Sequence, residues 1–111
     1  MSDTEEKFLW EILVPTQKNE PVGKNKWYTT RYHKLWDEKV RNIAGGLTIL
    51  SPAKGQWICP KGNLFAERMI PVRIYCTEAQ IDRIADLTAK HYEQLAIIFY
   101  VVGIKVKIKH Y

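Results

Sequence analysis

Hydrophobic positions along this chain alternate between short strand-like runs and two stretches with helical spacing. The first run, residues 8–14, is apolar except for Glu11 and is closed by Pro15, so it predicts a strand buried on both faces. Thr29 or Thr30 then caps a helix. Its apolar positions recur every three or four residues and define one buried face: Tyr32, Leu35, Trp36, Val40 and Ile43.

Glycines end the first helix and open a region of strands. Gly45-Gly46 follows the helical pattern directly, and we expect Gly46 to take the left-handed backbone conformation of a helix terminus. Strands are predicted over residues 47–50, 56–59 and 64–76, separated by turns at 51–55 and 60–63. Pro71 lies inside the last of these strands, and because proline donates no backbone hydrogen bond, we expect an edge or a bulge there.

A capping box predicts the start of the second helix. Thr77 precedes Gln80 by three residues, and the apolar stripe that begins at Ile81 continues to a helix end near Glu93. Residues 95–102 form the most hydrophobic segment and predict a central strand. Beyond Gly103, residues 104–109 alternate strictly between Ile or Val and Lys, as in a half-buried strand.

The element order is therefore β-α-β-β-α-β, which is the ferredoxin-like order of the α+β class. It predicts two helices on one face of a mostly antiparallel sheet, with or without a fifth strand. The 111 residues fit a single domain, 1–111, with a flexible N-terminus at 1–6 and a long loop at 16–29. A hydrophobic content of 46% is enough for a core without metals or disulfides.

The cysteines and the N-terminus bear on the compartment. Cys59 and Cys76 do not make a disulfide framework, and small buried hydrophobes on strands are the expected role. Residues 1–7 are polar and acidic and are not followed by the apolar h-region of a signal peptide, so no signal peptide is expected. These features predict a reduced protein in the cytoplasm, or in a host cytoplasm if the gene is viral.

Several short motifs between residues 35 and 108 resemble a bacterial domain-of-unknown-function family, number 3574. They are Gly46-Leu47-Thr48, Gly55-Gln56-Trp57, the turn at Gly62, Glu67 on the return strand, and Tyr92 with Gln94 just after. The loop at 16–29 is longer and richer in lysine than in that family, and the spacing from Tyr92 to Gln94 is compressed. The resemblance implies a fold and carries no established activity or catalytic residue.

One group of residues is the best candidate for a ligand site. Glu67 and Arg68 are adjacent on a predicted strand, with Thr48 and Trp57 on neighbouring ones. A carboxylate beside a guanidinium can hold a polar ligand or move a proton. The alternative is a cross-strand ion pair at the sheet surface, which is common and contributes little.

No motif points to a metal or a cofactor. His33, His91 and His110 are far apart, with no Cys or Glu at ligand spacing, and we expect His91 to serve the end of the second helix. Phosphate-binding loops and Cys-x-x-Cys pairs are absent from the sequence. We therefore expect no metal and no cofactor.

A net charge of +5 raises the question of nucleic-acid binding. Trp27, Tyr28 and Tyr32 lie among the basic residues of the long loop, as in single-strand binders. The candidate basic surface combines loop and C-terminal residues: Lys24, Lys26, Arg31, Lys105 and Lys107. The alternative for the C-terminal lysines is protection of an edge strand against aggregation.

These observations leave several functions open. A binding or interaction module acting as a homodimer is favoured, because 13 aromatic residues are many for a sheet with one face uncovered by helices. A small enzyme with its pocket around Glu67 is one alternative, and whether the chain is an enzyme stays open. The others are a nucleic-acid-binding protein, which is not favoured, and, for a phage gene, an inhibitor of host defence. No membrane partner is expected.

Overall fold

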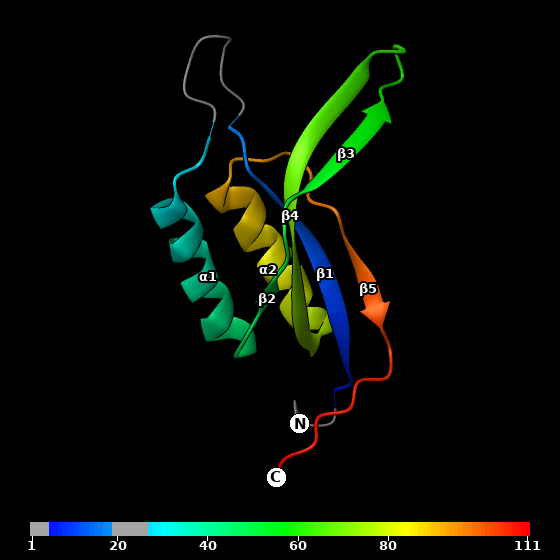
Figure 1. Ribbon diagram of the computed structural model, residues 1–111. Coiled ribbons are helices and arrows are strands. Elements are labelled where there is room, and N and C mark those ends of the chain that lie inside the picture. Colours follow the sequence, from blue (N-terminus) through cyan, green and yellow to red (C-terminus); the bar gives the residue numbers. More distant parts are fainter. Residues whose placement is uncertain (1–4, 19–26) are drawn as a thin grey trace.

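The computed structural model describes residues 5–18 and 27–111, except for the side chains of Trp57 and Phe65. Two helices and five strands make up this part of the chain (Figure 1). In chain order they are β1 (Lys7–Pro15), α1 (Thr30–Ala44), β2 (Thr48–Ile49), β3 (Ala53–Ile58), β4 (Leu64–Thr77), α2 (Glu78–His91) and β5 (Phe99–Gly103). The α+β class and the ferredoxin-like order are confirmed.

A single antiparallel sheet runs through the molecule in the order β2-β4-β1-β5, with β3 pairing the other half of the β4 edge. Both helices lie on the same face of this sheet (Figure 1). Alternate residues of β1 and β4, such as Ile12, Val72 and Ile74, point toward the helices and are fully buried with Trp36 of α1 and Ile84 of α2. The opposite face has no helix over it, and we call it the uncovered face.

The helix ends follow local chemistry. The Thr29 hydroxyl accepts a hydrogen bond from the Tyr32 amide at 3.2 Å, and Thr77 and Gln80 form the capping box that the sequence predicts. The expectation for Gly46 is wrong. The left-handed residue is Gly45, with φ 88°, and its amide donates to the Arg41 carbonyl at 2.8 Å, so the helix ends one position earlier.

β4 is long because it pairs with two different edge strands. Between them lies Pro71, whose carbonyl accepts from the Leu50 amide at 2.9 Å. The Pro71 nitrogen, which carries no hydrogen, therefore faces the gap between β2 and β3, in agreement with the predicted interruption of pairing at this residue. Beyond Met69, β4 pairs with β3 alone, and this hairpin projects away from the helices (Figure 1). We call β3 with residues 64–68 the arm.

Two strand predictions near the C-terminus are wrong. Residues 95–98 belong to no strand, and β5 lies at the edge of the sheet beside β1 and not at its centre. The segment 104–109 alternates as a strand does, yet it pairs with no strand of the described chain, and the fifth strand is β3. A strand needs a neighbour for its backbone groups as well as an alternating sequence, and the single chain offers 104–109 none.

The ends of the long loop are held to one another. Gln17 and Trp27 form an isolated bridge, and the Tyr28 amide donates to the Thr16 carbonyl at 3.0 Å. Both cysteines are free, as expected, although Cys59 is half-buried in the hairpin turn. Burial raises the pKa of the Cys76 thiol to about 11, which makes it a poor nucleophile. Within the described residues, neither helix is long and apolar enough to cross a bilayer.

Candidate functional site

A cavity of about 340 Å³ lies at the base of the arm, and we call it the edge cavity. Its walls come from three parts of the chain: the end of β1, the middle of β4 and the segment that leads into β5. They are mostly apolar, and the lining residues are Leu13, Pro15, Glu67, Met69, Gln94, Leu95, Ala96, Ile97 and Ile98. A cavity with apolar walls and a few polar groups is the usual form of a ligand or partner site.

Glu67 is the charged group of this cavity. It also lines a smaller adjoining cavity of about 50 Å³, together with Thr16, Lys18 and Gln94. Across the β3–β4 ladder Glu67 pairs with Gly55, so no side chain lies directly opposite its carboxylate. In the described part of the chain no cation lies within ion-pair distance of it. This carboxylate is free to meet a ligand or a partner.

Arg68 also lines the smaller cavity, but no ion pair joins its side chain to that of Glu67. Arg68 contributes its carbonyl, which accepts a hydrogen bond from the Thr16 hydroxyl at 2.5 Å. The ion-pair alternative for Glu67 and Arg68 is therefore not found either.

The structure separates Thr48 from Glu67. Thr48 pairs with Arg73 and lines a different cavity, of about 320 Å³, with Leu9 and Tyr75. Glu67 and Arg73 are six residues apart on β4, which is about 20 Å of extended chain. Trp57 pairs with Phe65 farther along the arm, but its side chain lies outside the described residues. The four residues do not form one site.

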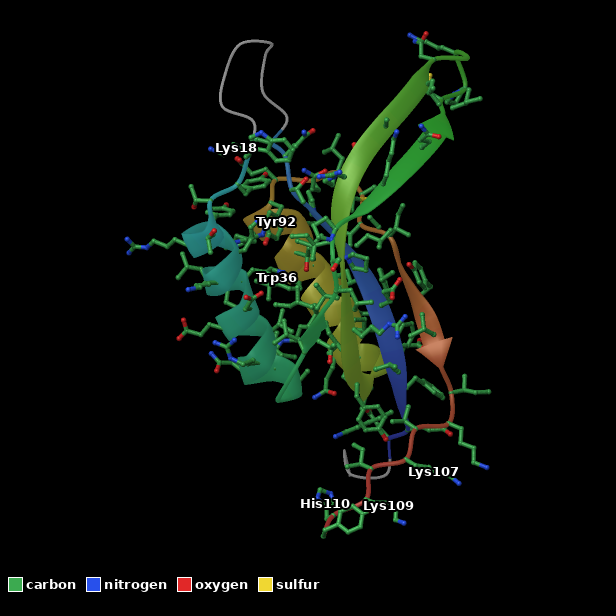
Figure 2. The ribbon with its side chains drawn as sticks, in the orientation of Figure 1. Lys18, Trp36, Tyr92, Lys107, Lys109 and His110 are labelled. Carbon is green, nitrogen blue, oxygen red and sulfur yellow. The ribbon has the colours of Figure 1, made fainter. Side chains whose placement is uncertain are left out.

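The basic residues that can be placed do not share a surface. Arg31 is exposed in the first turn of α1, beside the long loop, whereas Lys105 and Lys107 follow β5. Figure 2 shows Lys18, next to that loop, and Lys107 at opposite ends of the molecule. Lys24 and Lys26 lie outside the described residues. The structure therefore does not support a nucleic-acid surface that combines the basic residues near the long loop with those that follow β5.

A buried charged group on the uncovered face was missed as a site. Glu11 of β1 accepts hydrogen bonds from the Arg73 guanidinium at 3.0 Å and from the Tyr100 hydroxyl, which reach it from the two neighbouring strands. The bond from Tyr100 and the charge and bond of Arg73 hold the pKa of Glu11 below its usual value, against the effect of burial. The same contact raises the pKa of Tyr100 to about 12. Glu11 stands out in the sequence only as the exception in an apolar strand.

A second polar cluster joins the two helices and was also missed. The Tyr92 hydroxyl and Nδ1 of His33 are hydrogen-bonded at 2.6 Å, and His91 Nε2 donates to the Tyr32 carbonyl at 2.9 Å. Tyr28 stacks on Tyr32 and donates to the Tyr92 carbonyl at 2.6 Å. Figure 2 shows Tyr92 and Trp36 between α1 and α2. His91 thus ties α2 to α1, a role that its position at a helix end does not reveal.

Burial shifts the pKa of two groups in this cluster. Burial lowers the pKa of His33, with the Asp37 carboxylate opposing that change, and burial raises the pKa of Tyr92 well above its usual range. The described residues contain no group of three or more His, Cys, Asp or Glu side chains that could hold a metal ion.

Comparisons with known proteins agree with the fold. No family model and no curated protein matches the chain, so the resemblance to family number 3574 stays a prediction. Solved structures do match. One is CutA1 from Oryza sativa, with a TM-score of 0.67, 13% identity, and coverage of 96% of this chain and 87% of that one. Another is the divalent cation tolerance protein CutA1 from Thermus thermophilus, with a TM-score of 0.66, 8% identity, and coverage of 92% and 87%.

A third solved structure has a different activity. It is a phage SAM lyase in complex with S-methyl-5'-thioadenosine, with a TM-score of 0.61, 17% identity, and coverage of 90% of this chain and 84% of that one. Proteins with unrelated functions therefore share this arrangement of strands and helices. At these identities the likeness establishes one thing: the chain has the α+β, ferredoxin-like fold of the CutA1 structures.

Proposed function

We propose that this protein is a binding module that works as a homodimer assembled through β5. The observation that carries the proposal is an exposed apolar edge. β5 is the last strand of the sheet, and its outer backbone edge has no strand partner in the described chain. Large apolar side chains on and just before it are exposed: Ile98, Tyr100, Val101 and Val102.

Both properties favour association. An exposed strand edge presents unpaired amides and carbonyls that a second strand can satisfy, and a flat apolar edge is rarely left bare. Antiparallel pairing of β5 with β5 of a second copy satisfies one surface with itself, which is the contact that a two-fold dimer needs. It also joins two sheets into one continuous sheet.

Analytical ultracentrifugation tests this proposal. The full chain is expected to sediment at twice its 13.0 kDa mass. Val102→Asp should shift it toward the monomer, because a carboxylate would be buried in the pairing. The matched control is Ile49→Asp, since Ile49 is also exposed but lies at the opposite edge of the sheet. A chain of monomer mass at high concentration, or equal effects of both substitutions, would contradict the proposal.

A second candidate is a small-molecule site or small enzyme centred on Glu67. It is favoured by the unpaired Glu67 carboxylate next to the apolar walls of the edge cavity. A carboxylate can accept hydrogen bonds from ligand hydroxyl groups while apolar walls cover an aromatic ring. The ligand named for the phage lyase, S-methyl-5'-thioadenosine, combines these chemical groups and is a suitable probe.

A thermal shift assay tests this candidate. If the edge cavity binds the nucleoside, its addition should raise the melting temperature, because a ligand that binds only the folded state stabilises it. Glu67→Gln should reduce the shift. Glu38→Gln, an exposed position on α1, should leave it unchanged. No shift at millimolar nucleoside would remove this ligand.

A further inference from the structure

The cavity of about 320 Å³ beside β2, which we call the β2 cavity, is separate from the edge cavity, and the two share no lining residue. Its walls come from the connection between α1 and β2 and from the strands β1, β2 and β4. Leu9 and Leu47 give it apolar walls, and its polar side chains are Thr48, Arg73 and Tyr75. Its volume falls in the range of cavities that bind small molecules.

Arg73 supplies the charge of the β2 cavity, and no carboxylate is among the described residues that line it. The Arg73 Nε donates to Glu11 at 3.0 Å, whereas its two terminal nitrogens make no hydrogen bond or ion pair with a described residue. Those two nitrogens form a second edge of the planar guanidinium, and such an edge fits a carboxylate through two parallel hydrogen bonds. Arg73 therefore has one edge fixed by the protein and one edge open to a ligand.

The fixed edge keeps the guanidinium in position. The Glu11 side chain is only 12% exposed, and its second oxygen accepts a hydrogen bond from the Tyr100 hydroxyl. The two strands that flank β1 thus hold this carboxylate, and the carboxylate holds Arg73. A long side chain that is already ordered loses little conformational entropy when a ligand binds, so more of the interaction energy contributes to affinity.

The charges around the cavity favour a ligand with a single negative charge. Lys7 lies next to the cavity residue Tyr75, with its Nζ 5.8 Å from the centre of the Tyr75 ring. Lys7 and Arg73 are positive and Glu11 is negative, so the three groups together keep one positive charge. A carboxylate balances that charge, whereas a phosphate dianion would add a second negative charge close to Glu11.

A hydroxyl group lies beside the open edge of Arg73. Thr48 is directly opposite Arg73 in the β2–β4 ladder, so both side chains lie on the same face within reach of one ligand. The Thr48 hydroxyl makes no hydrogen bond with a described residue and can donate to a carboxylate oxygen. Leu9, Leu47 and the ring of Tyr75 supply apolar surface next to these polar groups.

We infer that the β2 cavity binds a small monocarboxylate with an apolar body. The open edge of Arg73 and the Thr48 hydroxyl hold the carboxylate, and the apolar walls contact the body. The inference goes beyond the proposed homodimer and does not depend on it, because β2 and β5 lie at opposite edges of the sheet. It also concerns a different ligand from the candidate site at Glu67, whose negative charge would repel a carboxylate.

Proton–nitrogen correlation NMR of the full chain tests the site, with 3-phenylpropionate as the probe. Its carboxylate and its phenyl ring match the two parts of the cavity, and 3-phenylpropanamide is the matched neutral compound. Saturable shifts are expected at the backbone amides of Leu47, Thr48, Arg73 and Tyr75. The neutral compound should bind about tenfold more weakly or worse, because it loses the charged hydrogen bonds to Arg73. Phenyl phosphate, the dianionic compound, should also bind more weakly than the carboxylate.

Substitutions separate the two polar groups of the site. Arg73→Met should weaken the binding of 3-phenylpropionate about tenfold or more, and Arg73→Lys should restore only part of it, because an ammonium group lacks the planar edge. Thr48→Val keeps the shape of the side chain and leaves the Glu11 contact in place, and it should weaken binding several-fold. Ser51→Ala removes an exposed hydroxyl outside the cavity and is the matched control, which should bind as the wild type does.

Several results would overturn the inference. They are equal affinities for the acid and the neutral compound, shifts confined to another surface such as the edge cavity, and no saturable shift at millimolar probe. Tighter binding of phenyl phosphate would contradict a monocarboxylate ligand. Should Arg73→Met fail to fold, the two compounds and Thr48→Val still decide the question. The sedimentation of the full chain is independent of these results, so the homodimer can fail or stand separately.

Discussion

Replacement of Trp36 by alanine is expected to lower the free energy of unfolding by about 3–5 kcal/mol, the usual cost of deleting a large buried aromatic side chain. Trp36 is 1% exposed and lies between the helices and the sheet. Its indole nitrogen donates to the Thr88 hydroxyl of α2 at 2.9 Å, so the substitution also removes one of the two hydrogen-bond partners of this buried hydroxyl. Urea denaturation followed by far-ultraviolet circular dichroism measures the change.

The neighbouring residue provides the control. Leu35 is on the same helix but 45% exposed, so Leu35→Ala should cost well under half as much as Trp36→Ala. Trp36→Phe, which keeps most of the volume and removes the hydrogen bond, should fall between the two. Equal costs for Trp36→Ala and Leu35→Ala would mean that α1 does not pack on the core as described.

Substitution of Arg73 by methionine is expected to destabilise the protein at neutral pH by about 1–2 kcal/mol, the order found when a charged group loses its hydrogen-bond partner. The Glu11 side chain is 12% exposed and would lose its cation, whereas the 43% exposure of Arg73 lets water offset part of the loss. Arg68→Met is the control, because Arg68 is exposed and makes no ion pair with a described residue.

The pH dependence identifies the cause. The pKa of Glu11 is lowered in the folded protein from its ordinary value of 4.5. Its ionised form therefore adds stability above that value, and this stability is lost as the pH falls through the folded-state pKa. The difference between the wild type and Arg73→Met should accordingly be present at pH 7 and shrink as the pH falls below 4.5 and through the lowered folded-state pKa of Glu11. A difference that does not shrink as the solution is acidified would point to lost packing.

The sequence predicted features that depend on neighbouring residues. The capping box at Thr77 and Gln80 and the buried stripe of α2 that begins at Ile81 each need only a short window of the chain. The helix ends at Gly45 and not at Gly46 as predicted. A short window of sequence cannot decide between two adjacent glycines, because either can adopt the left-handed conformation. The strand predicted over 104–109 failed because pairing needs a neighbour.

Prediction of the sites would have required knowledge of the strand register. Glu11, Arg73 and Tyr100 are spread over almost ninety positions and meet only because β4 and β5 flank β1 with Arg73 and Tyr100 opposite Glu11. Of the predicted ligand residues, Glu67 lines the edge cavity, and Arg68 lines the smaller cavity with it. Thr48 lies elsewhere because β2 and β3 pair with different halves of β4, which no pattern in the sequence reveals.

The arm gives the molecule two levels of stability. The part of β4 beyond Met69 pairs with β3 alone, with one further bond to the body from the Thr16 hydroxyl to the Arg68 carbonyl, and its tip residues Ile58 and Leu64 are exposed. Opening of this hairpin breaks its own ladder and that one bond and uncovers little apolar surface, so it costs far less free energy than unfolding of the body. Backbone amide hydrogens of the arm would thus exchange with solvent through local opening, whereas those of β1 would exchange only through global unfolding. Sequence changes at the tip would alter local motion without altering the midpoint of denaturation.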